Sequence, residues 1–584
     1  MENTLQNSKL HVPQIRPFLV PRPRLIAKLN DSLRTKLTLV FAPSGSGKTT
    51  LVASWLRPAD AVTKKSSFFG PDASSYAWLT LDPLDNAPAR FLTGLVGALQ
   101  TVDPRLGKLL LAMVQLPELP PIPTLLGSVI SDLGLWIARD YLPLTLVLDD
   151  YHHIESEFVQ QALAFLLDNQ PPQLHLVLLT NTAPPPALAR LRLLGQLVEL
   201  GEEDLRFDTA EAAQFLNDNL HLNLPGSVVE ALALGVSGWA AGLQLAALAI
   251  ERHADPRALV AALPADRLET SGFLLDEYLQ QQAPEMQRFL LLTSILPYLC
   301  ADLCDAVWRA GNQKSSFYPA AFMLDHLGTS NPFLAPLDAA GRWHAYHDLF
   351  AGLLRRRLER TGIDTAVLHR SAGEWLQANN LWEEAVPHFL AARAWDRAGE
   401  LLVKLADCLQ RRGEALTLRR WLEQMPAAQL QRQPALAVNY LWALILTGEP
   451  EKAETYLEPV IPLVQDAPAL KGQALYAQAF ISRSRYDVVS TIPLAREALA
   501  CLPPEQATAR SRLAVDLGIS LWTTGRMDET IPVLIEARRA SEEAANNYAR
   551  LTAIGFLALA YGVKGQFRRA AGLLQQALLR MALT

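Results

Sequence analysis

The chain has 584 residues, which is too long for one hydrophobic core, so we expect three or four domains. Hydrophobic residues make up 50% of the chain and charged residues 19%, a balance that excludes an intrinsically disordered protein. The net charge of -6 argues against a protein dominated by a nucleic-acid-binding surface.

Targeting and redox signals indicate the cytoplasm. The first ten residues are polar, and no apolar stretch reaches membrane-spanning length without a charge or a proline. Four cysteines in so long a chain make no disulfide framework. Cys300 and Cys304 lie one helical turn apart with no histidine or second cysteine pair nearby, so we interpret them as core residues rather than zinc ligands. We expect a cytoplasmic protein with no membrane partner.

Residues 15–25 contain three prolines, so they should run extended before a helix at about 25–33. An extended basic arm in front of a nucleotide-binding strand is well placed to fold over a nucleotide base. The alternative is a plain linker at the entry of the domain.

Residues 37–55 carry the principal chemical signal. A short apolar run at 37–41 predicts a buried parallel strand, a tight loop with two glycines follows, and an apolar-periodic helix opens at Lys48. This order is typical of a phosphate-binding P-loop, in which backbone N–H groups and a helix N-terminus converge on phosphate oxygens. Lys48 would reach the β- and γ-phosphates and the Thr49 hydroxyl would bind Mg²⁺. The expected nucleotide-binding residues here are Ser44, Gly45, Ser46, Gly47, Lys48, Thr49 and Thr50.

One position departs from the P-loop pattern, because Ala42 stands where the first glycine is usual. That glycine serves the turn more than the chemistry. The alternative interpretation is a glycine-rich turn between a strand and a helix with a surface lysine.

A second chemical signal lies at 144–150, an apolar strand that ends in two carboxylates. Open α/β sheets bind ligands at the carboxyl ends of their strands. With the upstream P-loop, this makes a Walker B strand in which Asp149 would hold Mg²⁺ and Asp150 would orient or deprotonate water as the catalytic residue. The following pair, His152 and His153, could line the site but is more often solvated.

Further strands are predicted at 76–80, 174–180 and 197–200, with a turn and helix cap at Asp85 and Asn86. Strands alternating with helices make a parallel sheet flanked by helices. From about residue 208 helices dominate. From about 366 the helices come in pairs, with repeat signals whose turns carry Gly448, Gly525 and Gly565.

The stretches 19–25, 42–51, 78–86, 146–152, 189–192, 204–207, 238–248 and 346–355 together resemble the MalT-type regulators. These are ATP-binding switch proteins of the STAND class (signal-transduction ATPases with numerous domains). The resemblance implies a P-loop domain at 1–207, a helical domain at 208–262, a winged-helix-like domain at 263–362 and a TPR-like sensor region at 363–584. The fold class is therefore multidomain α/β plus α.

The resemblance also assigns roles to further residues. Arg22 falls where the family's arm closes on the nucleotide. Gly242 begins the helical-domain motif that lies beside the base and ribose, and His347 falls on the winged-helix histidine that touches the β-phosphate of ADP. From its own sequence context, His347 could equally be a core histidine. An arginine run at 355–357 lies on an amphipathic helix and is interpreted as a solvated face.

The end of the strand at 174–180 departs from the family. The family usually finishes this strand with Ser-Arg, whose arginine senses the γ-phosphate, whereas this chain has Thr180 and Asn181. Asparagine offers no charge, so nucleotide binding is expected with slow ATP hydrolysis at most. Arg190 and Arg192 lie nearby in the sequence and are possible substitutes.

We therefore expect an ATP/ADP- and Mg²⁺-binding signalling switch whose repeats sense an unidentified inducer and whose active form self-associates. The alternatives are a P-loop enzyme with robust turnover and a repeat scaffold with a degenerate nucleotide fold. MalT-type proteins usually carry a LuxR-like helix-turn-helix after the repeats. Nothing in this chain matches such a DNA-binding domain, so we expect a fragment or a protein that has lost its output domain.

Overall fold

The strands of a parallel sheet lie between residues 37 and 200, and paired helices make up the chain from Trp395 onward. The computed structural model of the protein describes residues 9–13, 19–57, 75–114, 119–140, 143–182, 188–251, 253, 255–264, 266–311, 319–338, 341–544 and 546–583. The described residues up to Ala394 form one compact unit, and those from Trp395 onward form another. Part of the arm at 15–25 lies outside the described residues.

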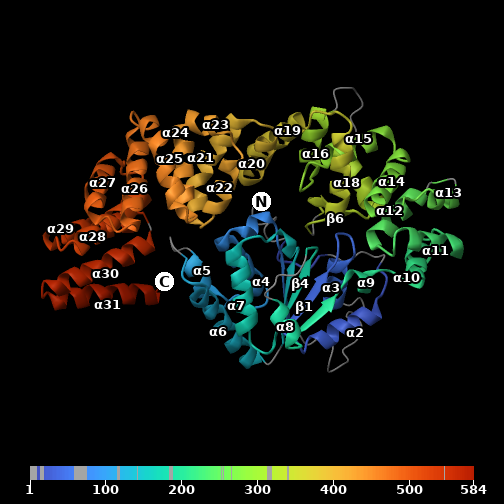
Figure 1. Ribbon diagram of the computed structural model, residues 1–584, viewed down its shortest axis with the longest axis horizontal. Coiled ribbons are helices and arrows are strands. Elements are labelled where there is room, and N and C mark those ends of the chain that lie inside the picture. The colour runs from blue at the N-terminus through green and yellow to red at the C-terminus, as the bar shows by residue number, and fades with distance from the viewer. Residues whose placement is uncertain are drawn as a thin grey trace. The chain divides into compact units, whose positions relative to one another are not determined.

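Five parallel strands form the sheet of the first unit, in the order β2-β3-β4-β1-β5 (Figure 1). The predicted strands are thereby confirmed, and those at 37–41, 144–150 and 174–180 have central residues that are buried on both faces. The strand bounds are Leu37–Phe41 (β1), Ser75–Thr80 (β2), Leu144–Asp149 (β3), Leu174–Thr180 (β4) and Leu197–Leu200 (β5).

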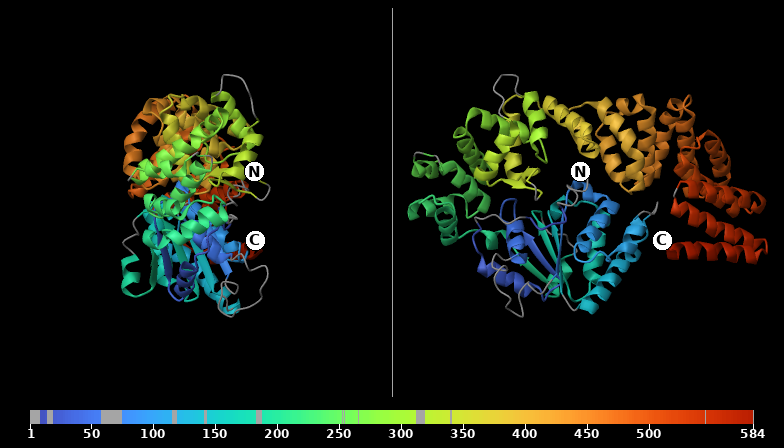
Figure 2. Two further views of the ribbon diagram at one scale, coloured as in Figure 1. Left: turned by 90° about the vertical axis from the view of Figure 1, so that its right-hand side faces the viewer. Right: turned by 180° about the vertical axis from the view of Figure 1, so that it is seen from behind.

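Helices cover both faces of this sheet. Successive side chains of a strand point to opposite faces, so neighbouring residues pack against different helices. In β1, Leu37 and Leu39 pack with α4 to α7, whereas Val40 packs with α2 and α3. This is the doubly wound arrangement of an α/β domain, visible from both sides in Figures 1 and 2. The helices are α2 (Pro23–Ser32), α3 (Lys48–Leu56), α4 (Pro88–Gln100), α5 (Lys108–Val114), α6 (Ile122–Asp140), α7 (Glu157–Asn169) and α8 (Ala189–Leu193).

The helix that follows the extended arm, α2, begins at Pro23, two residues earlier than predicted. Proline is tolerated at the first turn of a helix because its missing N–H would have had no partner there.

A group of helices follows the sheet in the first unit. It contains the antiparallel hairpin of β6 and β7, after which α18 begins. The elements are α9 (Glu202–Leu205), α10 (Thr209–Ala213), α11 (Gly226–Gly235), α12 (Ala240–Ile250), α13 (Pro256–Ala261), α14 (Arg267–Gln280), α15 (Pro284–Thr293), α16 (Ala301–Gly311), α17 (Ala320–Ser330), β6 (Leu334–Pro336), β7 (His344–Tyr346), α18 (Asp348–Glu359), α19 (Thr365–Ala378) and α20 (Trp382–Ala391).

Two sequence predictions about this part are confirmed. Cys304 is buried, and both Cys300 and Cys304 are free thiols. The arginines at 355–357 are exposed, while Leu353, Leu354 and Leu358 of the same helix are buried.

The second unit is an array of antiparallel helices in which neighbours such as α28 and α29 or α30 and α31 lie side by side (Figure 2). The predicted turn glycines Gly448, Gly525 and Gly565 all adopt a left-handed backbone, with φ of 79°, 75° and 73°. The longer helices are α21 (Trp395–Arg411), α24 (Pro434–Leu446), α25 (Pro450–Leu463), α26 (Pro468–Ser484), α27 (Val488–Cys501), α28 (Ala507–Thr523), α29 (Met527–Glu543), α30 (Asn547–Val563) and α31 (Phe567–Leu583).

Within the described parts of the chain, no helix has both the length and the apolar character needed to cross a bilayer.

Candidate nucleotide-binding site

The loop between β1 and α3 has the geometry of a phosphate cradle. Gly45 and Gly47 have φ of 76° and 87°, values that favour glycine. A Cβ atom built on Gly47 would meet no described atom within 4 Å, so there is open space beside the start of α3. The Ser46 hydroxyl is buried and has no hydrogen-bond partner within the described part of the chain. An open space, an orphaned hydroxyl and a helix N-terminus together fit a phosphate group.

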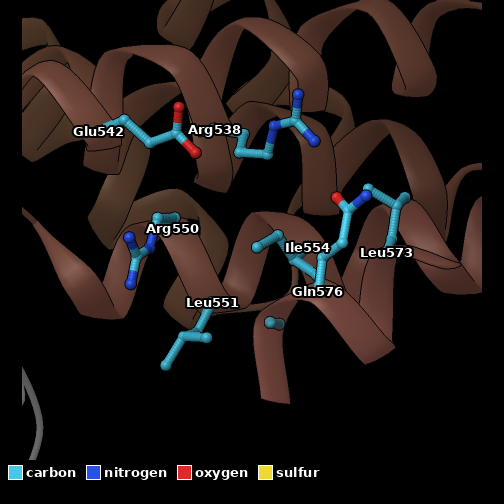
Figure 3. A pocket seen from close by; sticks show the side chains of 8 residues that line it. Arg538, Glu542, Arg550, Leu551, Ile554, Leu573 and Gln576 are labelled. Carbon is cyan, nitrogen blue, oxygen red and sulfur yellow. The ribbon is translucent and has the colours of Figure 1, made fainter. Parts of the chain in front are cut away.

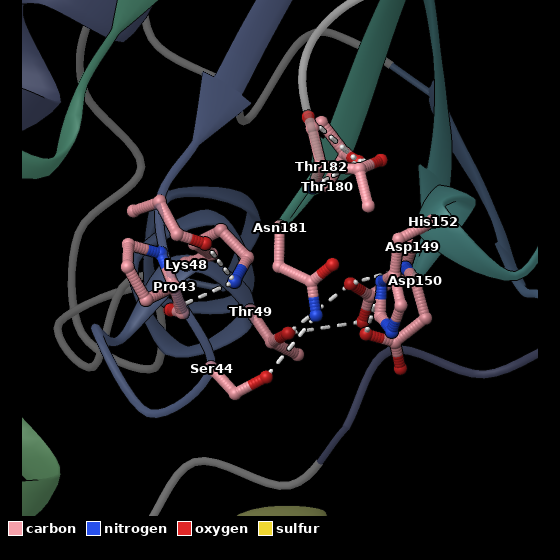
Figure 4. A network of polar contacts seen from close by, with 11 residues as sticks. Pro43, Ser44, Lys48, Thr49, Asp149, Asp150, His152, Thr180, Asn181 and Thr182 are labelled. Carbon is pink, nitrogen blue, oxygen red and sulfur yellow. Dashed lines mark hydrogen bonds and ion pairs between the residues drawn. The ribbon is translucent and has the colours of Figure 1, made fainter. Parts of the chain in front are cut away.

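Lys48 is almost completely buried (8% exposed) and folds back toward its own loop. Its Nζ donates to the carbonyl oxygens of Ala42, at 2.7 Å, and Pro43, at 3.2 Å (Figure 4). Burial lowers the pKa of Lys48, and the Asp150 and Asp149 carboxylates oppose this shift. A buried ammonium that has only carbonyl partners and two nearby carboxylates suits a phosphate ligand.

Thr49 and Asp149 meet across the site. The Thr49 hydroxyl lies 3.1 Å from both carboxylate oxygens of Asp149, which is fully buried at the end of β3. Burial, assisted by the neighbouring Asp150, raises the pKa of Asp149 to about 8. A hydroxyl and a carboxylate held together in this way are oxygen ligands of the type that Mg²⁺ prefers, and a cation there would relieve the cost of the buried charge.

Asp150 lies just beyond the strand, with a left-handed backbone (φ 54°) that turns its side chain out of the direction of β3. Burial raises the pKa of Asp150, and the Asp348 carboxylate raises it further. His152 lies 3.8 Å from Asp150 and is half-buried, and burial together with His153 lowers its pKa to about 4. Of the two alternatives for His152, lining the site or being solvated, the structure favours the first, because a 3₁₀ turn at 151–153 places it beside Asp150.

The end of β4 carries Asn181 close to the loop, where its Nδ2 donates to the Ser44 hydroxyl at 3.2 Å. Of the arginines considered as substitutes for the missing charge, Arg190 pairs with Asp168 at 3.4 Å and Arg192 pairs with Glu199 at 2.5 Å. These exposed ion pairs engage both guanidinium groups away from the P-loop, so neither supplies the charge that Asn181 lacks.

Asn86 has a positional role that the sequence did not reveal. Its Nδ2 donates to the carbonyl of His153 at 2.6 Å, and its Oδ1 accepts from the N–H groups of Glu155 and Ser156, both at 2.7 Å. One buried amide thus holds the segment that follows Asp150. Sequence spacing predicted only a turn, because these contacts join residues 67 to 70 positions apart.

The helical segment after the sheet touches the P-loop directly. The indole N–H of Trp239 donates to the carbonyl of Ser44 at 3.2 Å, and the N–H of Ala241 donates to the carbonyl of Gly45 at 3.0 Å. Gly242 is buried against Trp239, and a Cβ built on it would lie 2.6 Å from the indole ring. The structure therefore brings Gly242 next to the loop through its neighbours.

The helix α18 also reaches the loop, because a Cβ built on Gly45 would lie 3.3 Å from Leu349 Cδ2. His347 precedes α18 and caps it, with its Nδ1 accepting from the N–H of Leu349 at 3.3 Å. The Phe333 ring lies edge-on to the His347 ring, 6.0 Å away. His347 is exposed rather than buried in a core.

Arg22 lies apart from this group. Its guanidinium donates to the carbonyls of Leu205 and Arg206, at 2.8 and 2.9 Å, pairs with Glu211 and lies 4.8 Å from the Phe207 ring. Among the described residues, no hydrogen bond or ion pair of Arg22 reaches the P-loop. The arm is thus fixed to the segment at 204–211. Thr50, the last of the expected loop residues, is exposed on α3.

The helical array carries a small pocket between α29, α30 and α31, with arginine, glutamate and glutamine side chains above apolar ones (Figure 3). Its volume of about 170 Å³ is below the roughly 300–1,000 Å³ of ordinary ligand sites, so the pocket identifies no inducer. The lining residues are Arg538, Glu542, Arg550, Leu551, Ile554, Leu573, Gln576 and Ala577.

Comparisons with known proteins find relatives among transcriptional regulators and protein kinases. The family model described as the MalT winged helix domain matches residues 275–366. The chain is 30% identical over 575 residues to the HTH-type transcriptional regulator MalT of Yersinia enterocolitica, an alignment that covers 95% of this chain and 61% of that protein. It is 33% identical over 436 residues to the serine/threonine-protein kinase PknK of Mycobacterium tuberculosis, covering 74% of this chain and 37% of the kinase.

A solved structure shares the fold. The STAND protein with a tetratricopeptide repeat sensor from Pyrococcus horikoshii matches with a TM-score of 0.55 and 12% identity, over 97% of this chain and 84% of that one. The chain thus spans only part of the length of the curated relatives that it matches, 61% of MalT and 37% of PknK.

Proposed function

We propose, from the premise that this chain belongs to the MalT-type regulators of the STAND class, that it is a switch controlled by bound ATP or ADP. The observation that carries the proposal is the double contact on the P-loop. Both α12, through Ala241, and α18, through Leu349, touch Gly45 in the same loop whose glycines form the phosphate cradle. A nucleotide in the cradle is thereby linked to two further domains. The domain limits predicted from the sequence, at 208, 263 and 363, remain part of the proposal.

In this proposal the backbone N–H groups of 44–48 and the Lys48 ammonium bind the phosphates, and Thr49 with Asp149 holds Mg²⁺. Mg²⁺ neutralises charge on the β- and γ-phosphates when it is bound. Asp150 orients water, and Asn181 provides no charge at the γ-phosphate, so hydrolysis is slow and binding is the main activity.

His347 is suited to report the diphosphate state. Its Nδ1 accepts a hydrogen bond from Leu349, so the neutral ring carries its proton on Nε2. An Nε2–H group at the start of α18 is a donor that a β-phosphate oxygen accepts. Arg22 fixes the arm so that it closes over the nucleotide, and Gly242 lets α12 lie close to Trp239 and the base.

The array of helices senses an inducer, which is a small molecule or a protein, and the nucleotide controls domain opening and self-association of the active form. Regulation of transcription would be the output, as the name of the transcriptional regulator MalT states for that protein. The free cysteines are consistent with a cytoplasmic location.

Nucleotide analysis of the purified protein tests this function. Copurified ADP, together with a change in solution scattering when ATP replaces it, supports the switch. Rapid steady-state hydrolysis of added ATP would support an enzyme instead. No bound nucleotide, and no binding of ADP or ATP in calorimetry, would support a scaffold with a degenerate nucleotide fold.

A substitution of Lys48 tests the role of the P-loop lysine in nucleotide binding. The substitution should abolish nucleotide retention and leave the helical content of the array unchanged, whereas Lys108→Ala, on an exposed position of α5, should retain nucleotide. Retention of ADP by Lys48→Ala would show that Lys48 does not bind phosphate.

A further inference from the structure

Arg267 is a cation that the structure places near the P-loop, where it contacts Trp239 and pairs with Glu202. It is the first residue of α14, and its guanidinium lies 4.1 Å from the ring of Trp239. The same indole donates its N–H to the carbonyl of Ser44 in the loop. Arg267 therefore reaches the loop across a single side chain, although it lies more than 200 residues away in sequence.

The surroundings of Arg267 disfavour a positive charge. A cation at a helix N-terminus opposes the helix dipole. Burial lowers the pKa of Arg267, Glu202 opposes that shift and Arg206 adds to it, while the charge of Arg267 in turn lowers the pKa of Lys48. Two cations are thus held near each other with one direct carboxylate partner for Arg267, Glu202, at 3.0 Å from Nη1.

One donor of Arg267 is left over. Its Nη2 atom is buried and has no hydrogen-bond partner among the described residues, although 35% of the side chain is exposed, and such a donor is costly for a charged group. Buried donors of this kind are normally satisfied by the protein, by water or by a ligand. An anion close to the P-loop would satisfy it and offset the repulsion between Arg267 and Lys48.

The part of the loop nearest to Arg267 is its first half. Lys48, which reaches the β- and γ-phosphates in P-loops, donates to Ala42 and Pro43. The beginning of the loop, including Ser44, therefore lies toward the end of the phosphate chain that carries most charge. At the same place β4 ends in the uncharged Asn181.

We infer that Arg267 is a phosphate-binding residue, whose Nη2 and positive charge bind the phosphate chain of the bound nucleotide from the start of α14. This inference rests on the proposed nucleotide switch and deepens it. The competing interpretation is that Arg267 serves only as an ion-pair partner of Glu202 that holds the domains together.

Calorimetry with adenosine, ADP and ATP on the full chain separates these interpretations. Arg267→Gln should weaken binding of ADP and ATP about tenfold, because a hydrogen bond to a charged group is lost. Binding of adenosine, which has no phosphate, should not change. Glu202→Gln removes the ion pair but keeps the donor, so ADP affinity should stay the same or increase. Arg257→Gln, an exposed arginine of α13, is the control.

Three outcomes overturn the inference: unchanged ADP and ATP affinities in Arg267→Gln, an equal loss for adenosine, or an equal loss in Glu202→Gln. If Arg267→Gln does not fold, as judged by circular dichroism, the ADP affinities of Arg267→Lys and Glu202→Gln still distinguish the two interpretations. Lysine keeps the charge but loses the planar fork, so Arg267→Lys should bind ADP with intermediate affinity. If the wild type binds neither ADP nor ATP, the proposed switch itself fails. If the wild type binds both and Arg267→Gln binds them equally well, only the inference about Arg267 fails.

Discussion

The amide of Asn181 donates to the hydroxyl of Ser44 at 3.2 Å, so an uncharged hydrogen bond joins the end of β4 to the P-loop. The MalT-type pattern has an arginine at this position. The neutral contact keeps the loop in place, but it brings no positive charge to a transferring phosphoryl group. In the proposed switch this pair would support nucleotide binding while leaving hydrolysis without an important electrostatic contribution.

Asn181→Arg should increase steady-state ATP hydrolysis by at least about tenfold, since an arginine at a transferring phosphoryl group is worth orders of magnitude in rate. Phosphate release at saturating ATP and Mg²⁺ measures the change. Asn181→Ala, which removes the contact to Ser44 without adding charge, is the control and should not accelerate hydrolysis. Equal rates for the arginine and alanine variants would show that this position does not limit turnover.

Asp149 should make the nucleotide-free protein lose stability as the pH rises. Its pKa is about 8 in the folded state and 3.8 as the ordinary value, so the unfolded chain releases this proton first. Relative to Asp149→Asn, the free energy of unfolding of the wild type should fall between about pH 4 and pH 8, by at most roughly 1.4 kcal/mol per pH unit.

Thermal unfolding of the wild type and of Asp149→Asn between pH 5 and pH 8 measures this difference in stability. The comparison isolates the contribution of Asp149, because the buried histidines are the same in both proteins. Asp168→Asn, on an exposed carboxylate, should follow the wild type. Parallel pH profiles for the wild type and Asp149→Asn would contradict the assigned shift.

Gly45 and Gly47 should respond differently to the same substitution. Both have positive φ, so alanine adds strain of roughly 1 kcal/mol or more at either position. At Gly45 the new methyl would also lie 2.5 Å from Ala241 Cβ, whereas at Gly47 it would point into open space. Gly45→Ala should therefore displace α12, and Gly47→Ala should obstruct phosphate while leaving α12 in place.

Hydrogen exchange at the N–H of Ala241, which donates to the Gly45 carbonyl, measures the docking of α12. Protection should fall in Gly45→Ala and persist in Gly47→Ala, and ADP affinity should fall in Gly47→Ala. Equal protection of Ala241 in both variants would rule out the proposed close contact.

The helical array offers a second matched pair. A methyl on Gly518 of α28 would lie 2.3 Å from Leu534 Cδ2, whereas one on Gly555 of α30 would meet nothing within 4 Å. Gly518→Ala should destabilise the array by about 1–3 kcal/mol through overpacking. Gly555→Ala should stabilise it by about 1 kcal/mol, because alanine is the better helix former. Denaturant unfolding measures both, and the same sign of change in both variants would refute this account of the packing.

Much of the sheet and the cradle could be predicted from the sequence because their signals are local. The apolar runs of β1, β3 and β4 are buried on both faces, and Lys48, Thr49 and Asp149 follow from strand–loop–helix order. His152 could not be predicted, because its burial depends on how the chain turns after Asp150. Trp239 and Arg267 could not be found either, since they meet the loop only through contacts that span about 200 residues.

The contact of Gly45 with Ala241 leaves less clearance than a single methyl group requires. A loop with so little slack cannot shift its backbone toward or away from a guest without pushing the neighbouring helix by a similar amount. Loop and helix should therefore move together, so that any displacement of the loop that a ligand causes would be passed on to α12.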